Sequence, residues 1–267
     1  SYAFFPGCQL AGSDPRYVTR TYEWLRSKKP DAAIWMTCCG APAEWAGEVD
    51  IHAAHLEEMR RQWRELGEPT VVLACPNCRK MFEEYLPELP VVFLAEVMEE
   101  WGVETAGTAG EPYALFDPCA SRYYPELQES VRHLADAAGI TWEHLPYDGK
   151  KARCCGYGGH IGIASPSHTS YMTTSRAKEE ELPYVTYCVN CRESFAGQGK
   201  EAVHILDLLF GLNGAGRPAA TVTERWHNRL AVKRELLKTY WNETIEEETH
   251  MKLEVEKELE RKLSASQ

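Results

Sequence analysis

Cysteine is the residue type in this 267-residue sequence whose number and spacing point most clearly to chemistry. Its ten cysteines form two sets of five, C-x29-CC-x35-C-x2-C followed by C-x34-CC-x32-C-x2-C. The first set is Cys8, Cys38, Cys39, Cys75 and Cys78, and the second set is Cys119, Cys154, Cys155, Cys188 and Cys191. Each set has one single cysteine, one adjacent pair and one CxxC motif in the same order, so the pattern is duplicated.

The residues around the cysteines repeat as well. Gly40 and Gly156 follow the adjacent pairs, and both CxxC motifs contain an asparagine and precede an arginine, Arg79 or Arg192. Farther along, VVFLAEVMEEWG matches AVHILDLLFG. These matches indicate an internal repeat of about 110 residues, which must be recognised before any finer interpretation.

Three kinds of cysteine chemistry compete for this pattern. Disulfides are disfavoured, because five cysteines per repeat is an odd number and no secretory signal accompanies them. A CxxC motif is half of a common structural zinc site, but zinc takes four ligands and leaves thiols unexplained. Thiolates also select iron–sulfur clusters, and an ordinary cubane again takes four.

A fifth thiolate on one cluster requires either a sulfur that bridges two irons or an iron with two thiolates. An adjacent Cys-Cys pair can do either, because its two sulfurs lie close together. Gly40 and Gly156 would let the backbone approach a cluster and leave an N–H free to point at a cluster sulfide, although each glycine could equally serve an ordinary turn.

Short apolar segments that resemble strands precede the cysteines. They cover residues 2–5, 32–36 and 70–74 in the first half and 113–116, 141–145 and 184–187 in the second. Helices are expected at about residues 15–28, 43–66, 77–85, 125–138 and 167–181, with Asp14 as a possible N-cap. This alternation predicts an α/β fold of two pseudo-symmetric repeats, each a small, mostly parallel sheet flanked by helices. Because sites in such sheets lie at the carboxyl ends of strands, each set of five thiols should meet at one sheet edge.

Composition shifts divide the chain into three parts. TAGTAGE at 105–111 and GLNGAGRPAA at 211–220 predict a first repeat over 1–108, a second over 109–215 and a C-terminal helical tail over 216–267. The tail contains WHNRLAVKRELLKTYW and then the acidic EEETHMKLEVEKELERKL. Its apolar residues are sparse, so it is either a solvated surface helix or a docking helix for another chain or domain.

Composition excludes several functional classes. With 44% apolar residues the chain can bury a core, and a formal net charge of −11 argues against a nucleic-acid partner. No apolar run is long enough to span a membrane, and the start, SYAFFPGCQL, lacks the features of a secretory signal. We therefore expect a cytoplasmic protein. The missing initiator Met indicates a trimmed start or a piece of a longer polypeptide.

The motif CCG followed by CxxC, present twice with a single cysteine upstream, resembles the cysteine-rich CCG-domain family. The best-understood member of that family is the catalytic B subunit of heterodisulfide reductase. The resemblance covers residues 2–211 and fills all ten cysteine positions, although the gaps of 29 and 32 residues are slightly short. It implies that each set of five cysteines ligates one non-cubane 4Fe-4S cluster. It also implies that a disulfide is reduced between the two clusters, with electrons from a flavoprotein or ferredoxin-like partner.

The resemblance directs attention to charged residues beside the cysteines, because the family's heterodisulfide substrate is strongly anionic. The candidates that could meet a substrate anion or offset cluster charge are Arg79, Lys80, Arg122, Lys150, Lys151, Arg153 and Arg192, all of which could instead be solvated surface residues. His160 in CCGYGGHIG is the candidate catalytic proton donor, with a structural role as the alternative. We expect His52, His55 and His144 on helix or strand surfaces.

Two functions of different classes follow from this resemblance. In the first, the chain is a heterodisulfide reductase-like enzyme whose clusters form the active site. In the second, it is an electron-relay subunit or domain of a larger flavin-dependent complex with no substrate of its own. A zinc-stabilised interaction scaffold is a third alternative.

Overall fold

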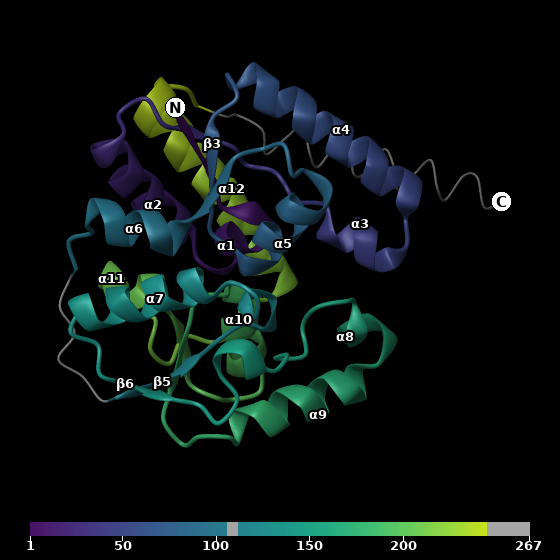
Figure 1. Ribbon diagram of the computed structural model, residues 1–267, viewed down its shortest axis with the longest axis vertical. Helices are drawn as coiled ribbons and strands as arrows, with labels where there is room; N and C mark the ends of the chain where they lie inside the picture. Colours follow the sequence, from purple (N-terminus) through teal and green to yellow (C-terminus); the bar gives the residue numbers. More distant parts are fainter. Residues whose placement is uncertain (106–111, 245–267) are drawn as a thin grey trace.

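The computed structural model describes residues 1–105 and 112–244, and these ranges contain two four-stranded parallel sheets (Figure 1). The first sheet consists of β1 (Tyr2–Phe5), β2 (Ala33–Ile34), β3 (Thr70–Leu73) and β4 (Val91–Phe93). The second consists of β5 (Tyr113–Phe116), β6 (Trp142–His144), β7 (Tyr184–Thr186) and β8 (Ala202–His204). Their strand orders, β2-β1-β3-β4 and β6-β5-β7-β8, are equivalent. The predicted fold of two α/β repeats is therefore confirmed.

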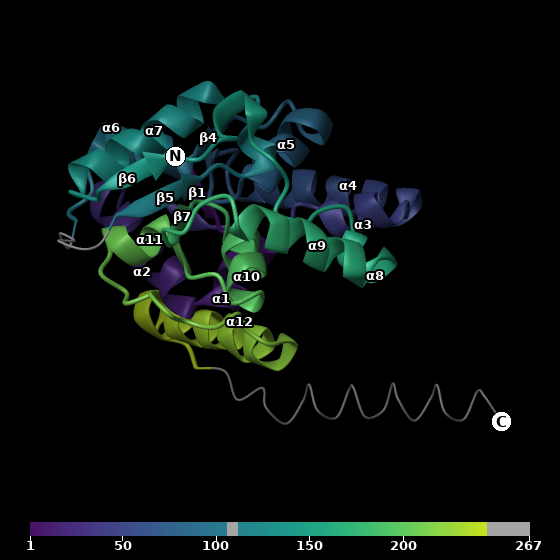
Figure 2. The same cartoon turned by 90° about the horizontal axis from the view of Figure 1, so that it is seen from below.

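Helices connect and cover the strands in both repeats. The first repeat contains α1 (Gly7–Ser13), α2 (Pro15–Lys28), α3 (Ala41–Ala46), α4 (Val49–Glu65), α5 (Pro76–Tyr85) and α6 (Leu94–Trp101). The second contains α7 (Pro125–Ala137), α8 (Ile161–Ala164), α9 (Pro166–Ala177), α10 (Val189–Gly197) and α11 (Ile205–Leu209), with short 3-10 turns at Cys119–Ser121 and Gly149–Lys151. In both views, α3 and α4 lie on the same side of the molecule as α8 and α9 (Figures 1 and 2).

Local sequence signals explain where several elements begin. The carboxylate of Asp14 accepts a hydrogen bond from the backbone N–H of Arg16 at 2.9 Å, and Pro15 occupies the first turn of α2. This is the predicted N-cap arrangement, which satisfies a backbone donor at the helix start. In β1, β3 and β5 three consecutive residues are buried, as expected for strands covered by helices on both faces.

The structure corrects three sequence-based expectations. The single helix expected over 43–66 is two helices, α3 and α4, because Gly47 adopts a left-handed conformation (φ 74°) that ends α3. The helix expected over 167–181 ends at Ala177. Strands β4 and β8 were not predicted, since each is only three residues long and leads directly into a helix.

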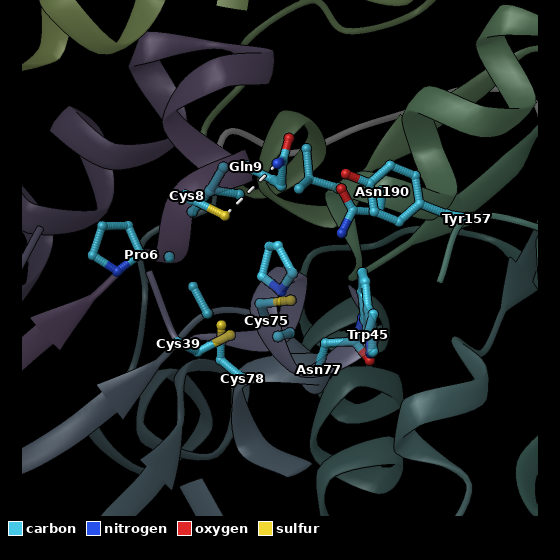
Figure 3. Close-up of a pocket in the computed structure, with 16 residues that line it drawn as sticks. Pro6, Cys8, Gln9, Cys39, Trp45, Cys75, Asn77, Cys78, Tyr157 and Asn190 are labelled. Atoms are coloured by element: carbon cyan, nitrogen blue, oxygen red, sulfur yellow. Dashed lines mark hydrogen bonds between the residues drawn. The ribbon is translucent and has the colours of Figure 1, made fainter. Parts of the chain in front are cut away.

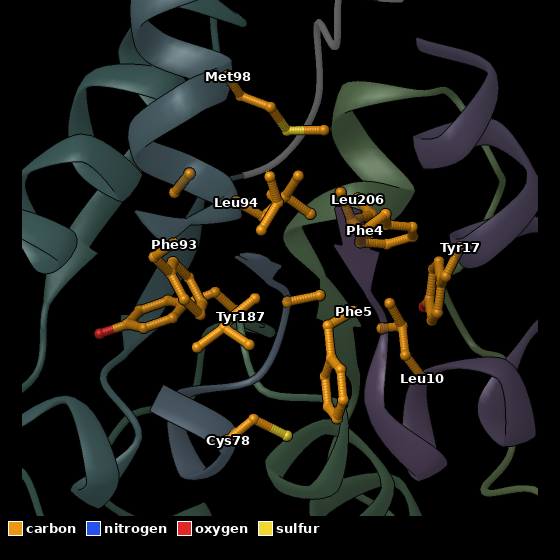
Figure 4. Close-up of a cluster of buried hydrophobic side chains, with 14 of the residues drawn as sticks. Phe4, Phe5, Leu10, Tyr17, Cys78, Phe93, Leu94, Met98, Tyr187 and Leu206 are labelled. Carbon is orange, nitrogen blue, oxygen red and sulfur yellow. The ribbon is translucent and has the colours of Figure 1, made fainter. Parts of the chain in front are cut away.

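The two repeats share one hydrophobic core. Figure 4 shows Phe5 and Leu10 of the first repeat in the same cluster as Tyr187 and Leu206 of the second, and all four side chains are at most 2% exposed. Phe93 also contacts Tyr187, with ring centroids 6.4 Å apart. Burial of this common surface holds the two sheets in a fixed relation.

Polar contacts also cross between the repeats. The Ser13 hydroxyl donates to the Glu193 carboxylate at 2.6 Å, and the Tyr17 hydroxyl donates to Asp207 at 2.5 Å. The predicted boundary at 108/109 lies outside the described residues, so the limits of the repeats stay a prediction. The shared core and these buried contacts make the described ranges one folded body.

The tail begins with α12 (Val222–Leu236), which is followed by a π-helical turn at Leu237–Trp241. Helix α12 lies along α1 and α2 of the first repeat (Figure 2), and its Val232 and Leu236 side chains are buried. The acidic second half of the tail falls outside the described residues. Within the described ranges, no helix is both long enough and apolar enough to span a bilayer.

The burial of Leu236 gives a stability test of the α12 contact. Leu236→Ala should lower the free energy of unfolding by about 2–3 kcal/mol, because the side chain is only 3% exposed. Val222→Ala is the control on the same helix, since Val222 is 79% exposed and its truncation should cost less than about 0.5 kcal/mol. Urea unfolding of the reduced protein measures both values. Equal stabilities for the two variants would contradict the docked arrangement of α12.

Burial of His204 predicts a pH dependence of stability. Its Nδ1 accepts a hydrogen bond from the N–H of Leu206, and burial lowers the pKa of the imidazole to about 3. The unfolded chain, with a histidine pKa of about 6.5, binds a proton between these values that the native state does not bind. This contribution to stability is therefore complete above about pH 6.5 and is lost as the pH falls toward about 3.

We expect His204→Asn, which keeps a cap acceptor, to lose less unfolding free energy than the wild type between about pH 6.5 and pH 4. Urea titrations at several pH values measure this difference, and comparison with the wild type cancels the contribution of the carboxylates. The same pH slope in both proteins would contradict the assignment of a buried neutral imidazole.

Candidate metal centre

The cysteines of both sets lie at the carboxyl ends of the strands. In the first repeat Cys8 lies in α1 after β1, Cys38 and Cys39 follow β2, and Cys75 is the N-cap of α5 after β3. In the second repeat Cys119 follows β5, Cys154 and Cys155 follow β6, and Cys188 is the N-cap of α10 after β7. The central strands β1 and β5 are each flanked by the next two strands of their repeat, so the thiols meet where the strand order reverses.

Each set is brought together as a continuous series of contacting thiols. In the first set, Cys8 contacts Cys38 at an Sγ–Sγ distance of 3.7 Å, and interactions continue through Cys39 and Cys78 to Cys75. In the second set the series runs from Cys119 through Cys154, Cys155 and Cys191 to Cys188. All ten cysteines are free thiols.

The two sets also meet each other. The Cys75 and Cys188 thiols lie close enough to shift each other's pKa, so the last residues of the two series are neighbours. Both lie at the N-terminus of a helix, α5 or α10. The pKa of Cys75 is held well below its ordinary value by Cys188, by Cys78 and by backbone N–H groups of α5, whereas Cys75 and burial raise the pKa of Cys188 well above its ordinary value. The ten thiols therefore form one sulfur-rich region that crosses between the repeats.

The protein stabilises thiolates at equivalent positions of the two sets. The thiol of Cys39, followed by that of Cys8, lowers the pKa of Cys38 to about 2, and the N–H of Gly40 adds to the effect. The thiols of Cys119 and Cys155 lower the pKa of Cys154 to about 2 in the same way. Metal ions bind thiolates and not thiols, so each set presents a deprotonated donor without any added metal.

Gly156 meets two structural demands that other residues would not. Its φ is 95°, and an added Cβ would lie 2.9 Å from the Thr173 hydroxyl oxygen and 3.1 Å from the Thr169 carbonyl oxygen. Its backbone N–H donates to the Cys154 sulfur at 3.3 Å. This contact is to a cysteine sulfur of the pair, and the expected contact of the N–H with a cluster sulfide stays a prediction.

Gly40 holds the corresponding position in the first repeat. Its φ is 86°, and an added Cβ would lie 3.0 Å from the ring of His52. His52 is only 7% exposed and packs edge-on against Tyr85, so the prediction that it lies on a helix surface is wrong. His55 Nε2 lies 2.8 Å from the Cys38 carbonyl oxygen, so His55 supports the cysteine pair while His52 packs beside Gly40.

The second repeat replaces these histidines with hydroxyl groups. The Thr173 hydroxyl donates to the Cys155 carbonyl oxygen at 2.7 Å, while His144 lies on the surface beside Asp148 as expected. His52 and His55 are three residues apart, a spacing that places two side chains on one face of a helix. The sequence alone did not show that this face is turned toward the CCG turn, because the start of α4 was not predicted.

Two of the predicted arginines, Arg192 and Arg79, bind other groups of the protein. Arg192 is fully buried, and its guanidinium donates to Glu193 at 2.7 Å and to the Pro218 carbonyl at 3.0 Å. Arg79 pairs with Glu83 at 2.6 Å and lies over the ring of Tyr124. These contacts occupy donors that were expected to meet a cluster or a substrate anion.

The other predicted cations either contact protein groups or lie exposed on the surface. Arg122 donates to the Ala152 carbonyl at 3.0 Å, Arg153 lies 3.2 Å from the ring centroid of Tyr147, and Lys80 lies 4.0 Å from Glu84. Lys150 and Lys151 lie in an exposed 3-10 turn. His160 begins α8 in a left-handed conformation (φ 53°), and its ring lies edge-on to Trp45 with centroids 5.6 Å apart.

A pocket opens beside the first set of thiols (Figure 3). Its cysteine residues are Cys8, Cys39, Cys75 and Cys78, and its other polar or aromatic lining residues are Gln9, Trp45, Asn77, Tyr157 and Asn190. Asn77 and Asn190 are the equivalent asparagines of the two CxxC motifs, so both repeats contribute to one pocket. The repeat made this pair visible in the sequence, but only the packing of the repeats shows that the pair faces one space.

Helix α12 supports the first set from outside. Arg229 Nε donates to the Cys8 carbonyl oxygen at 2.8 Å, and Arg225 donates to Gln9 Oε1 at 2.9 Å. The Gln9 amide in turn lies 3.7 Å from the Cys8 sulfur. Arg225 also binds the buried Glu193 carboxylate at 3.0 Å, which links the tail to the second repeat.

These donors fit a thiolate-bound cluster by their chemistry. Each set supplies five sulfurs, a stabilised thiolate, a helix N-terminus and a glycine N–H beside the cysteine pair. In the described part of the chain, no three His, Cys, Asp or Glu residues are arranged around the position of a single ion. The thiols instead form extended series.

Two α/β repeats that each collect five thiols at a common edge define a duplicated cysteine-rich domain. The chain belongs to the cysteine-rich domain family CCG, whose model matches residues 2–83 and 113–196. This match confirms the resemblance seen in the sequence.

Two curated relatives come from methanogens. The chain is 24% identical over 225 residues to the B subunit of the fumarate reductase (CoM/CoB) of Methanothermobacter marburgensis, an alignment that covers 77% of this chain and 44% of that protein. It is 24% identical over 184 residues to an uncharacterized iron-sulfur protein of Methanocaldococcus jannaschii, with coverage of 66% and 36%. The chain thus spans less than half the length of these relatives.

One solved structure has a weak likeness to this fold. It is the glutamate racemase isoform RacE1 of Bacillus anthracis, with 9% identity, a TM-score of 0.34 and coverage of 91% of this chain and 94% of that chain. A likeness of this size carries no argument about function.

The crowding at Gly156 gives a matched test of the site geometry. Gly156→Ala should destabilise the reduced apoprotein more than Gly159→Ala, because both residues have positive φ but only Gly156 has neighbours within 4 Å of an added Cβ. The backbone cost of about 1–2 kcal/mol is common to both variants. Urea unfolding measures the difference, and equal losses would contradict the close approach of α9 to the CCG turn.

Proposed function

We propose that this chain is an iron-sulfur oxidoreductase module that binds two non-cubane 4Fe-4S clusters and reduces a disulfide between them. The first cluster would be held by the cysteines from Cys8 to Cys78 and the second by those from Cys119 to Cys191. The observation that carries this proposal is the gathering of two five-thiol sets at the carboxyl ends of equivalent strands, with Cys75 and Cys188 close enough to shift each other's pKa. The names of the two relatives, a reductase subunit and an iron-sulfur protein, support it.

The number and chemistry of the donors support clusters in preference to single ions. Five thiols in each series exceed the four ligands of zinc, while iron clusters accept thiolates at several irons. When bound, the clusters would supply electrons singly. Ten reduced thiols also favour a reducing compartment, and we propose the cytoplasm.

The residues of the chain would orient the substrate and control its surroundings. Trp45 and Tyr157 supply aromatic walls that exclude water, while Asn77 and Asn190 supply amides beside the CxxC motifs. His160, next to Trp45, is the proposed proton donor to a released thiolate. Reduction of a disulfide needs two electrons and two protons, so a proton source near the pocket is required.

The name of a relative supports a partner. Because the chain resembles a protein named as the B subunit of a reductase, we propose that a flavoprotein or ferredoxin-like subunit or fused domain supplies the electrons. Helix α12 would transmit the state of such a partner to Cys8, since Arg225 and Arg229 connect it to Gln9 and to the Cys8 backbone.

An electron-relay function is the second candidate, and the closeness of Cys75 and Cys188 favours it. Sites that lie this near each other would let electrons pass between them with no substrate between them. Anaerobic addition of disulfides to the reduced protein distinguishes the two functions. Reoxidation by a disulfide supports the reductase, whereas reoxidation only by a protein or dye acceptor supports the relay.

Metal content tests the cluster assignment. Two clusters of four irons predict about eight iron and eight sulfide per chain after anaerobic reconstitution. Cys38→Ser and Cys154→Ser occupy equivalent positions in the two sets, and each should lose about half of the iron, because only one set is damaged. Loss of all iron from either variant would contradict two separate sites, and zinc without sulfide in the wild type would contradict clusters altogether.

A further inference from the structure

We propose that Gln9 raises the reduction potential of the first cluster by donating a hydrogen bond to the Cys8 sulfur, and that Arg225 of α12 positions Gln9 for this. The second cluster has no such donor, so the effect is confined to one site. This inference rests on the proposed clusters and names a control on the first of them. It is carried by a series of contacts that runs from the second repeat through α12 to Cys8.

The side-chain amide of Gln9 directs its N–H groups toward Cys8. Its Nε2 lies 3.7 Å from Cys8 Sγ, a contact that Figure 3 marks with a dashed line. The other end of the amide, Oε1, accepts a hydrogen bond from Nη1 of Arg225 at 2.9 Å. An arginine N–H group can only donate, so the atom that faces it must be the amide oxygen. Arg225 therefore determines which end of the amide reaches the sulfur.

Arg225 is itself held in place by a buried carboxylate. Its Nη2 donates to Glu193 at 3.0 Å, and its Nε donates to the Ala220 carbonyl oxygen at 3.0 Å. The Glu193 side chain is 3% exposed, and it also accepts from the Ser13 hydroxyl at 2.6 Å. Release of Arg225 would leave a buried charge with one partner fewer, which is strongly unfavourable. Glu193 of the second repeat thus fixes the residue that orients the amide of the first.

Helix α12 also holds the backbone of α1, the helix that carries both Cys8 and Gln9. Arg229 Nε donates to the Cys8 carbonyl oxygen at 2.8 Å, and the Asn228 amide donates to the Gly12 carbonyl oxygen at 2.9 Å. Gly12 permits this approach, because an added Cβ would lie 3.0 Å from the Arg229 guanidinium. The donor and the sulfur are therefore both fixed relative to α12.

The second repeat has no equivalent of this side chain. Ala120 follows Cys119 where Gln9 follows Cys8, and a methyl group cannot donate a hydrogen bond. The glycine N–H beside the cysteine pair, in contrast, is common to both repeats. The amide donor is thus a feature that distinguishes the first set of thiols from the second.

A donor at a ligand sulfur changes the energy of reduction. Reduction adds negative charge to a cluster and its thiolates, and a fixed N–H group stabilises that charge. Hydrogen bonds to the sulfurs are among the factors that set the potentials of iron–sulfur clusters. The step is the transfer of one electron from a reductant, which is dithionite in the test, and no bond breaks and no proton is taken up.

A redox titration followed by EPR tests the effect at each site separately. The full-length reconstituted protein is titrated in two backgrounds, Cys154→Ser to report on the first cluster and Cys38→Ser to report on the second. In the first background, Gln9→Leu should lower the ratio of reduced to oxidised cluster about tenfold at a given potential. This corresponds to a midpoint about 59 mV lower for one electron. In the second background the midpoint should not change.

A double-variant cycle tests the positioning role of Arg225. Arg225→Lys keeps the positive charge but lacks the planar fork that binds Gln9 and Glu193 together, so the first midpoint should fall. Combined with Gln9→Leu it should cause no further fall, because both changes remove the same hydrogen bond. Additive falls would overturn the positioning role. Gln198→Leu is the control, since this exposed amide lies away from Cys8 and should leave both midpoints unchanged.

Iron and sulfide contents measured before each titration separate this inference from the function on which it rests. Wild-type protein that takes up no cluster would overturn the proposed function. Cluster-loaded Gln9→Leu with an unchanged first midpoint would overturn the role of Gln9 and leave that function intact, and so would an equal fall at both sites. Gln9→Met has a side chain of similar length without an N–H, and it should reproduce the shift if leucine disturbs the folding of α1.

Discussion

The shared hydrophobic core of the two repeats is the constraint on which the arrangement of this molecule depends, because it brings Cys75 and Cys188 close enough to shift each other's pKa. Helices α5 and α10 begin at these two cysteines, so the relation of the two sheets places their N-termini near each other. The shared core around Tyr187 and the buried Ser13–Glu193 contact hold that relation. A duplicated α/β unit alone would give two separate sheet edges, whereas the packing of the repeats creates one sulfur-rich region.

Duplication has not made the two sites equivalent. The first cysteine pair is supported by the imidazole of His55, with His52 packed beside Gly40, while the second pair is supported by the hydroxyl of Thr173. Helix α12 contacts the first set, binding Gln9 through Arg225 and the Cys8 carbonyl oxygen through Arg229. The pocket also lies on the side of the first set. Cys8 and its neighbours thus have the contacts expected of the site that meets a substrate or a partner.

The sequence predicted the parts of this structure that depend on local pattern. Strands before cysteines, the Asp14 cap and the collection of each set of thiols follow from periodicity and from the rule for strand ends. It did not predict that Arg192 would be buried against Glu193 or that Tyr157 would line the same pocket as Cys75. Those outcomes depend on contacts between residues far apart in the chain, and no local pattern records which surfaces of two similar repeats will meet.

The measurement that tests the central claim most directly is an iron anomalous-scattering map from anaerobically grown crystals of the reconstituted protein. The account predicts two groups of iron peaks, one beside each set of five cysteines, with Cys75 and Cys188 between the groups. A single peak at either set, or iron bound away from the cysteines, would contradict it.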